Sequence, residues 1–365
     1  MRRTWNGSGG FISASGDERF NGRADGRRAS MILRAVIVGC GWIGSRFNEG
    51  PRKRGSVYAH AAAYRHAKGV RLVAVADIDP ARREQCRKAW GVPSAYADYR
   101  EMLRREAPDL VSICTPDETH YEVARAALAA PSVRGILCEK PLATQVEEAA
   151  AIVRRAATRG VRLAVNYIRR YDRGHQQAAR LIKEGVLGRI EKGRGVYSGG
   201  ILHNGSHLLD LLLWFLGPIE EIVSLPETKQ VGPDPGVDAW LRFRSGASVM
   251  IQACSARNYP VFELDLLGAN GRLEIRRAGE RFHWFGVKSQ PASFDRRVLV
   301  PMRHSSSSRL RDLTLAAVRD LVTAVRDNRA LLCDGRTAVA CLTVGHRVIE
   351  SMRIGEARHA GLSSE

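Results

Sequence analysis

A glycine-rich turn is the first feature of this chain that could do chemistry. Residues 39–44 read GCGWIG and follow the β-branched run Ile32–Val38 directly. Between a strand and a helix, G-x-G-x-x-G is the pattern that holds a dinucleotide pyrophosphate. The first glycine permits the tight turn, the second lets the phosphates approach the backbone, and the third lets helix and strand pack closely. The helix N-terminus adds amide donors. The residues expected to contact the dinucleotide here are Gly39, Gly41, Trp42, Ile43 and Gly44.

An acidic residue after the second apolar run bears on which dinucleotide binds. Asp77 follows Val70–Ala76, where a carboxylate can accept both ribose hydroxyls, and no Arg or Ser follows at once to hold a 2′-phosphate. We therefore expect NAD, with NADP less favoured. The alternative is that Asp77 caps the next helix. Asp77 also lies beyond the usual ~20 residues from the glycines. We attribute the extra length to an inserted loop, Phe47–Ser56, whose basic run Arg52–Arg54 either meets an anionic substrate or is solvated.

A lysine is placed for chemistry at the same edge of the predicted sheet. Lys140 follows the apolar run Gly135–Glu139 and precedes Pro141, so its backbone is expected to be extended. Like the glycine turn and Asp77, it falls just after the carboxyl end of a strand, where α/β sheets bind ligands. Such a lysine can donate hydrogen bonds to substrate hydroxyls and stabilise a developing alkoxide. The alternative is an ordinary surface lysine.

A histidine lies near the start of a later helix, Ser206–Leu216. His207 can accept a hydroxyl proton near neutral pH. Asp210 shares its helix face and can orient the imidazole. The alternative is that His207 caps the helix and Asp210 is solvated. Because His203 stands four residues before His207, a zinc site is a further alternative, but no glutamate follows the first histidine and no third ligand is apparent, so we expect no metal.

The elements that must position these residues alternate between strands and helices up to residue 165. This alternation predicts a parallel sheet with helices on both faces, a Rossmann doubly wound fold. The strands are expected at Ile32–Val38, Val70–Ala76, Leu110–Cys114, Gly135–Glu139 and Val161–Val165, and the helices at Val57–His66, Ala81–Ala89, Tyr99–Arg105, His120–Ala129 and Val146–Arg159.

From about Asn166 the pattern changes to helices followed by successive strands. Gly185 and Gly217 stop the two helices, and residues 244–246 and 268–271 read as hairpin turns. This order predicts an α+β domain with a largely antiparallel open sheet, covered by helices on one face. The strands are expected at Glu220–Leu225, Asp238–Phe243, Ala247–Ala256, Phe262–Leu267, Arg272–Ile275 and Phe282–Val287, and the helices at His175–Glu184, Ser206–Leu216, 309–328 and 334–354.

The chain has 365 residues, more than a single core usually contains. Residues 1–30 lack an apolar pattern and are interpreted as a disordered basic tail or a wrongly assigned start, with Met31 a natural beginning. We expect residues 31–165 to bind NAD. Residues 166–365 are expected to bind the substrate and to form a homodimer or homotetramer through the open sheet face.

Composition narrows the class of protein. The net charge of +19 comes mostly from arginines scattered along helices, without a helix-turn-helix or zinc-finger spacing. We therefore expect solvated faces rather than nucleic-acid binding, with an anionic substrate as a milder alternative. Apolar runs are too short for a membrane span. Cys40, Cys114 and Cys138 lie in strand-like runs as small buried hydrophobes, which favours a reducing compartment, the cytoplasm.

Several segments together resemble the glucose–fructose oxidoreductase, inositol dehydrogenase and rhizopine-catabolism family of dehydrogenases, over about residues 32–354. The residues that carry the resemblance are the Gly39–Gly44 turn, Thr115-Pro116 with His120, Glu139-Lys140-Pro141, Arg170-Tyr171 and the run Gly199–Gly217, with its GSHLLD segment over 205–210. The resemblance implies an NAD-dependent dehydrogenase that moves a hydride between a secondary alcohol of a sugar-like substrate and nicotinamide.

The resemblance also implies roles for single residues. His207 matches the general base of the family, and Lys140 would steady the substrate oxygen. Many members carry an aspartate that helps to bind the substrate where this chain has His203, followed by Asn204, which leaves the proton path open. His203, Asn204 and Asp210 are expected to contact the substrate. The residues expected beside the cofactor are Thr115, Pro116, His120, Glu139 and Lys140. Those expected to line the substrate cleft, or else to be packing residues, are Tyr167, Arg170 and Tyr171.

Two rival functions remain open. One is an NAD-binding regulator or sensor without turnover, because a fold does not imply a function. The other is a hydrolase or lyase of the same family that oxidises its substrate transiently and then returns the hydride.

Overall fold

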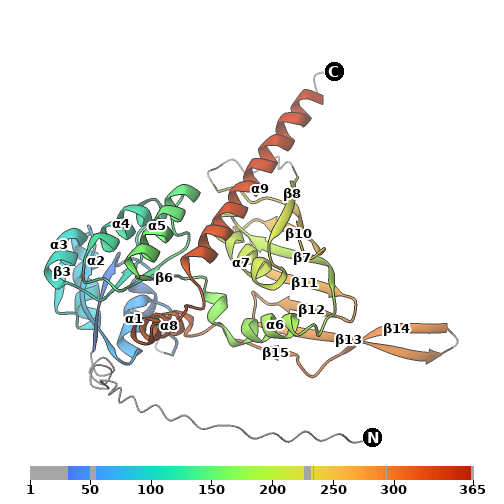
Figure 1. Ribbon diagram of the computed structural model, residues 1–365, viewed down its shortest axis with the longest axis horizontal. Helices are drawn as coiled ribbons and strands as arrows, with labels where there is room; N and C mark the ends of the chain where they lie inside the picture. Colours follow the sequence, from blue (N-terminus) through green and yellow to red (C-terminus); the bar gives the residue numbers. More distant parts are fainter. Residues whose placement is uncertain (1–31, 50–54, 226–231, 233, 293, 363–365) are drawn as a thin grey trace, which may run out of the picture. The chain divides into compact units, whose positions relative to one another are not determined.

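A parallel sheet forms the N-terminal half of the protein (Figure 1). The computed structural model describes residues 32–49, 55–225, 232, 234–292 and 294–362. The strand order is β3-β2-β1-β4-β5-β6, and β1 pairs in parallel with both β2 and β4. This is the Rossmann order, which confirms the predicted fold class. The strands are β1 Leu33–Val38, β2 Val70–Ala76, β3 Ser94–Tyr96, β4 Leu110–Ile113, β5 Gly135–Cys138 and β6 Arg162–Val165.

Helices connect these strands and cover them. Every residue of β4 and β5 is buried, as expected for strands with helices on both faces. α2 shows both helix signals clearly, because Asp79 caps its N-terminus and Gly91 ends it with a φ of 62°. The helices are α1 His60–His66, α2 Pro80–Trp90, α3 Tyr99–Glu106, α4 His120–Ala129 and α5 Val146–Arg159, with the 3-10 turns η1 Arg46–Asn48, η3 Asp117–Thr119 and η4 Ile168–Tyr171.

A largely antiparallel sheet forms the second half, as predicted. Its order is β14-β13-β12-β11-β7-β10-β9-β8, with β15 paired to β13. The pair β7–β10 is parallel, and the two expected hairpins join β9 to β10 and β11 to β12. The strands are β7 Ile190–Ser198, β8 Ile219–Ser224, β9 Ala239–Phe243, β10 Ser248–Cys254, β11 Phe262–Gly268, β12 Gly271–Arg276, β13 Arg281–Ala292, β14 Phe294–Pro301 and β15 Ser306–Ser307.

Strand β7 lies in the middle of this sheet and was not predicted from the sequence. Its residues include Gly193 and Gly195, which weaken the apolar alternation of a strand. A Cβ on Gly195 would lie 2.6 Å from Leu208 Cδ2 of α7, so the glycine allows the helix to pack closely on the strand. The short strands β3 and β15 and the longer strand β14 were also missed, and β13 runs five residues further than expected.

Helices of the second half pack on both sheets. α7 packs on β7, whereas α9 contacts α7, β8 and also α5. α8 contacts α1, β5 and β6, so a helix from late in the chain helps to cover the Rossmann sheet (Figure 1). The predicted domain boundary at residues 165 and 166 stays a prediction. These helices are α6 Arg173–Lys183, α7 Gly205–Leu216, α8 Leu313–Asp327 and α9 Gly335–Leu362.

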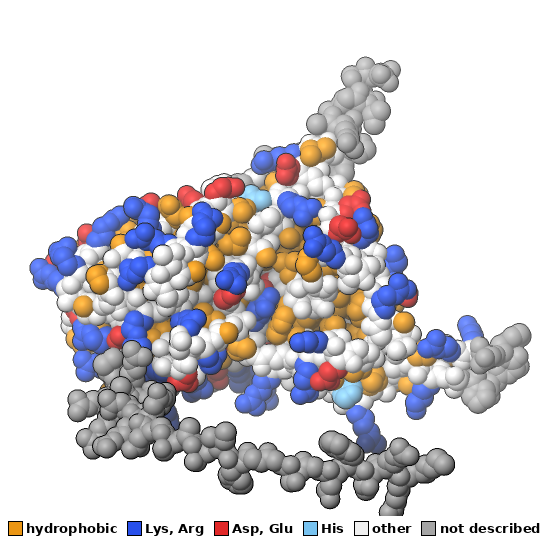
Figure 2. Space-filling model, viewed as in Figure 1, with side chains coloured by type: hydrophobic (Ala, Val, Ile, Leu, Met, Phe, Trp, Pro, Cys, Tyr) orange, Lys and Arg blue, Asp and Glu red, His pale blue; other side chains and the backbone are white. Residues whose placement is uncertain are grey.

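The distribution of charged side chains and of cysteines agrees with what the composition predicted. Lys and Arg side chains are spread over the face seen in Figure 2 rather than gathered in one stripe. The side chains of Cys40, Cys114 and Cys138 are buried and not in disulfides, as predicted. Within the described part of the chain, no helix is both long and apolar enough to cross a membrane. The predicted tail, residues 1–30, lies outside the described residues.

Candidate active site

The three glycines of the turn after β1 differ in their surroundings. Gly39 has a φ of +97°, and a Cβ there would lie 2.5 Å from the carbonyl oxygen of Cys114. A Cβ on Gly44 would lie 2.0 Å from the carbonyl oxygen of Gly39. A Cβ on Gly41 would meet nothing within 4 Å. Gly39 and Gly44 are therefore required for packing, whereas Gly41 leaves open space, which is where a pyrophosphate would approach the backbone.

The turn does not open an α-helix directly, which corrects the prediction. The N–H groups of Ser45 and Arg46 donate to the carbonyl of Gly41, both at 3.0 Å, and η1 follows. The next α-helix, α1, begins at His60 rather than at Val57. The His60 N–H donates to the Ile43 carbonyl at 2.9 Å, in place of the bond that residue 47 would make in an unbroken helix. The helix is therefore interrupted by the inserted loop, as its extra length suggested.

Two side chains of the turn lie on the outside. Trp42 is 61% exposed, and the Arg46 guanidinium lies 5.3 Å from its ring centroid. Ile43 is partly buried against the core. The basic run Arg52–Arg54 lies outside the described residues, so its predicted contact with an anionic substrate stays a prediction.

Asp77 is tied to the glycine turn. Its Oδ2 accepts from the Cys40 N–H at 2.7 Å, and its Oδ1 accepts from the Asp79 N–H at 2.9 Å. The cap of α2 is Asp79, whose carboxylate accepts from Ala81 and Arg82 at 2.8 and 3.2 Å. The alternative that Asp77 caps this helix is therefore wrong. Asp77 is held at the strand tip beside the turn, where a ribose would lie.

The loop after β4 presents one free hydroxyl and one fully engaged histidine. The Thr115 Oγ1 is buried and has no partner among the described residues. The ring of His120 is buried, with Nδ1 2.6 Å from the Pro141 carbonyl and Nε2 2.9 Å from the Thr115 carbonyl. His120 therefore ties the loop after β4 to the loop after β5 rather than offering a free nitrogen to a ligand. Pro116 precedes η3 and accepts from the Thr119 hydroxyl at 2.7 Å.

Glu139 is the end of a buried hydrogen-bond chain. Its Oε1 accepts from His60 Nε2 at 2.9 Å and from Asn166 Nδ2 at 2.7 Å. His60 Nδ1 lies 3.0 Å from the Ser112 hydroxyl, which is 2.9 Å from that of Tyr64. Burial by itself raises the pKa of Glu139, but His60 and Asn166 bring this pKa below its ordinary value. Glu139 is therefore a fixed carboxylate at the ligand edge of the sheet.

Sequence reasoning missed the partners of Glu139. His60 lies in an alanine-rich helix and looks like a core histidine, and Ser112 lies inside a strand. The position of Asn166 was the available signal, because it follows β6 at the ligand edge. Its Oδ1 is buried without a partner among the described residues. Asn166 Oδ1, Thr115 Oγ1 and the open side of Gly41 thus lie at the ligand edge of the Rossmann sheet and can take hydrogen bonds or close contacts from a ligand. The residues present therefore fit a dinucleotide.

Lys140 joins the two halves of the site. Its Nζ donates to the carbonyl of His203 at 3.0 Å, and its peptide bond to Pro141 is cis. The side chain is largely buried at 8% exposure, so it is not an ordinary surface lysine. Burial lowers the pKa of Lys140, while the nearby carboxylates of Glu139, Asp117 and Asp234 act in the opposite direction.

His207 lies in the first turn of α7 with an unused nitrogen. Its ring meets the ring of Tyr167 edge-on, with centroids 5.8 Å apart. Nδ1 is buried and has no partner among the described residues. Burial, followed by the charges of Arg169, Lys140 and His203, holds the pKa of His207 well below its ordinary value. His207 is thus neutral at pH 7 and able to accept a proton.

Asp210 does not orient His207, which corrects the prediction. Both of its carboxylate oxygens accept from Arg170 Nε, at 2.8 and 3.1 Å. The Arg170 guanidinium also lies 4.9 Å from the Trp214 ring centroid. Burial raises the pKa of Asp210 to about 6, with Arg170 acting in the opposite direction. The pair is an internal ion pair that fixes η4 to α7, so Arg170 packs rather than binds substrate.

The residues before α7 face acidic neighbours. His203 is exposed, with Nδ1 3.9 Å from Asp117 Oδ2, and this contact brings the pKa of Asp117 below its usual value although burial raises it. Asp234, a residue that sequence reasoning missed, accepts from the N–H groups of Leu202 and His203 at 2.7 and 3.0 Å. Asn204 donates to the Ser198 carbonyl at 2.9 Å. Among the described residues no group of His, Cys, Asp and Glu could hold a metal ion.

Tyr167 and Tyr171 are buried. Tyr167 is 1% exposed and touches the substrate side only through its ring contact with His207. Tyr171 is 5% exposed, in the turn that packs against α8, and its hydroxyl has no partner among the described residues. Both positions favour the packing alternative over direct lining of the cleft.

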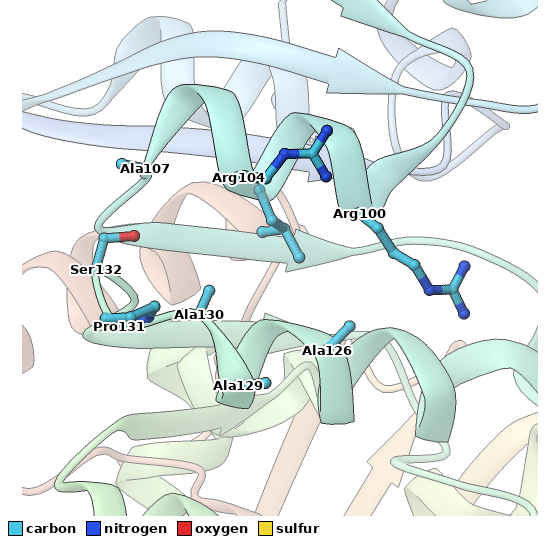
Figure 3. A pocket seen from close by; sticks show the side chains of 9 residues that line it. Arg100, Arg104, Ala107, Ala126, Ala129, Ala130, Pro131 and Ser132 are labelled. Carbon is cyan, nitrogen blue, oxygen red and sulfur yellow. The ribbon is translucent and has the colours of Figure 1, made fainter.

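A surface pocket elsewhere is unrelated to this chemistry. It lies between α3 and α4, with Arg100, Arg104 and several alanines on its walls (Figure 3). None of the predicted site residues lines it. The convergence of Lys140 and His207 is therefore the better candidate for a reaction site.

Comparison with known proteins assigns the class. Residues 33–167 match the NAD-binding Rossmann fold of the GFO/IDH/MocA oxidoreductase family, and residues 191–358 match its C-terminal alpha/beta domain. The chain belongs to this family, which confirms the resemblance inferred from the motifs. Its first half is the NAD-binding domain.

Three named proteins are similar to this chain in sequence. The chain is 28% identical to D-glucoside 3-dehydrogenase of Escherichia coli, over 55% of this chain and 57% of the relative. It is 26% identical to scyllo-inositol 2-dehydrogenase (NAD(+)) of Bacillus subtilis, over 80% and 91%. It is 28% identical to 2,7-anhydro-N-acetylneuraminate hydratase of Escherichia coli, over 52% and 59%. The chain thus spans little more than half the length of the first and third of these relatives.

A solved structure shares the fold. Levoglucosan dehydrogenase in complex with NADH superposes with a TM-score of 0.74 at 18% sequence identity, covering 88% of this chain and 97% of the other. At this identity the likeness supports the architecture alone.

Proposed function

We propose that this protein is an NAD-dependent dehydrogenase that oxidises a secondary alcohol of a sugar, a cyclitol or a related derivative. The observation that carries the proposal is the hydrogen bond that brings Lys140 to the segment just before the His207 helix. Lys140 comes from the NAD-binding domain and bonds to the carbonyl of His203, four residues before His207 on the second domain. A hydrogen-bond donor and a neutral base thus face one place beside the ligand edge of the Rossmann sheet. The dehydrogenase names of two relatives agree with this reading.

Different residues of the protein bind the dinucleotide, accept the proton and stabilise the substrate oxygen. NAD, when bound, supplies the nicotinamide that accepts the hydride. The edge that would hold it carries the Gly39–Gly44 turn, Asp77, Thr115, Glu139 and Asn166. His207, neutral at pH 7, takes the hydroxyl proton on its imidazole ring; because Nδ1 is buried, Nε2 is the nitrogen open to a substrate. Lys140 Nζ has further N–H groups besides the one given to His203. It donates one of them to the substrate oxygen and stabilises the charge that develops there.

Variants of the two residues test the proposal. Purified protein is offered NAD with a panel of sugars, inositols, sugar acids and nucleotide sugars, and NADH is followed by absorbance. With the best substrate, Lys140→Ala and His207→Ala should each lower kcat by about 10²–10⁴-fold. The double variant should be much less than multiplicatively worse, because the two groups act together. Lys183→Ala and His283→Ala, at exposed positions, are the matched controls. Near-normal turnover by His207→Ala would refute the proposed base.

A second function has a specific observation in its favour. One relative is named a hydratase, so transient oxidation followed by return of the hydride is an alternative outcome for this site. Such an enzyme would change its substrate without net NADH, which product analysis by mass spectrometry distinguishes. A protein that binds NADH and converts nothing in either assay would instead be a regulator or sensor.

Assembly is a separate proposal. The outer face of the second sheet carries a ladder of charges, in which Arg272 contacts Asp265 and Glu274, and Arg276 contacts Glu263. We propose that two or four copies of the chain pair through this face. Light scattering on the purified protein measures the mass and would contradict the proposal by finding a monomer.

A further inference from the structure

An arginine without a counter-ion lies beside His207. Arg169 belongs to η4, and its guanidinium carbon stacks 3.6 Å from the Phe262 ring centroid. One terminal nitrogen makes a long contact of 3.5 Å to the Ala278 carbonyl. Its Nε is fully buried and has no hydrogen-bond partner among the described residues. Burial lowers the pKa of Arg169 to about 10, so the group keeps its charge at neutral pH.

The nearest acids are engaged elsewhere. Asp210 accepts twice from Arg170. Asp172 accepts from the His175 ring at 2.7 Å and from the Ser308 hydroxyl. Across the described part of the chain, no carboxylate oxygen comes within 4.0 Å of an Arg169 nitrogen, although many other arginines form such ion pairs. Arg169 is half-buried, and a guanidinium whose Nε is cut off from both water and a partner is poorly solvated, so proteins usually pair such a group.

Arg169 is on the substrate side of the site. Tyr167, two residues earlier, packs edge-on against the His207 ring. Of the charged groups around His207, Arg169 has the largest effect on its protonation, ahead of Lys140. The Arg169 guanidinium therefore lies near the His207 ring, and a substrate that contacts His207 can extend toward it. A rigid planar guanidinium, fixed from one side by an aromatic ring, suits the bidentate recognition of a carboxylate.

We propose that Arg169 binds a carboxylate of the substrate, which makes the substrate a polyhydroxy acid such as an aldonate or a uronate. This inference rests on the proposed dehydrogenase function and names its substrate class. A single guanidinium matches the single charge of a carboxylate. A phosphate would bring up to two charges to a place where the described residues include one unpaired guanidinium.

Matched substrates test the assignment. D-Glucuronate is compared with D-glucose, D-gluconate with sorbitol, and glucose 6-phosphate with both acids, each with NAD. We expect the acids to exceed their neutral partners by at least about 10-fold in kcat/KM, since bonds to charged groups are the stronger ones. KM for the acids should rise with ionic strength. Arg169→Gln also removes a charge that acts on His207, which affects all substrates alike. The ratio of kcat/KM on the acids to kcat/KM on the neutral compounds should therefore fall by about 10- to 100-fold.

A binding readout keeps the test independent of turnover. With NADH present, D-glucuronate should raise the melting temperature of the wild type but not of Arg169→Gln, and Arg169→Lys should keep part of the rise because it keeps the charge. Arg194→Gln, on β7 and bonded to Gln252, is the control. Equal losses on acids and neutral polyols in Arg169→Gln would show a structural role and overturn the assignment, as would a preference for the phosphate. Rapid oxidation of neutral polyols alone would refute this inference and leave the dehydrogenase proposal intact.

Discussion

Glu139 offers the sharpest check on the buried hydrogen-bond chain beneath the site. Its Oε1 is the acceptor for His60 Nε2 and for Asn166 Nδ2, and both donors are almost completely buried. Glu139→Ala removes that acceptor and leaves two buried donors unpaired. Because each such group costs about 1–3 kcal/mol, the free energy of unfolding should fall by about 2–6 kcal/mol.

Urea unfolding, followed by intrinsic fluorescence at pH 7, measures this loss. Glu139→Gln should lose less, about 1–3 kcal/mol, because an amide oxygen can still accept both bonds and only the strength added by the carboxylate charge is lost. Glu118→Ala removes an exposed acid from the neighbouring turn η3 and is the matched control; surface changes of this kind usually stay within about 0.5 kcal/mol. Wild-type-like unfolding of Glu139→Ala would refute the hydrogen-bond argument.

The pH dependence adds a second check on Glu139. Since its folded pKa lies below its ordinary value, its contribution is complete above the unfolded pKa of about 4.3 and is lost as the pH falls through the folded value. The difference between wild type and Glu139→Ala should therefore be largest at neutral pH and shrink in acid. Glu139 also raises the pKa of Lys140. Its removal should move the alkaline limb of kcat to lower pH.

Two further results are expected. Asp77→Ala should narrow the preference for NADH over NADPH, measured by fluorescence titration, whereas the helix-cap variant Asp79→Ala should leave that preference unchanged; tighter binding of NADPH by the unaltered protein would contradict the assignment. The acid limb of kcat/KM should fall below pH 6.5, because burial and neighbouring positive charges lower the pKa of His207, and a limb above pH 6.5 would show that another group supplies the base.

Much of the fold could be predicted because its signals are local. The boundaries of β2, α4 and α5 agree with the prediction to the residue, since each is a periodic segment bounded by clear stops. Strand β7 could not be found in the same way. Its glycines serve a contact with Leu208 on α7, and nothing in the neighbouring sequence shows that contact.

The candidate site was likewise predicted in part, with the site residues found but some of their partners missed. The glycine turn, Lys140 and His207 were predicted as site residues, and the structure brings Lys140 to the segment that begins the His207 helix. The expected role of Asp210 was wrong, whereas the placement of His120 beside the cofactor stays a prediction. Spacing of three residues places Asp210 on the same helix face as His207, but the Arg170 guanidinium, forty residues away in sequence, takes both carboxylate oxygens.

The sequence by itself determined the helices and most of the strands in their order, the turn expected to receive a pyrophosphate, and the residue types able to donate and accept a proton. These depend on backbone preference and on neighbours within a few positions. The tertiary structure alone decided which buried charges are paired. Asp210 pairs with Arg170, and Glu139 accepts from His60 and Asn166, whereas Arg169 pairs with no carboxylate in the described part of the chain. The physical reason is that pairing in a buried site depends on distances of a few ångströms between segments that lie far apart along the chain.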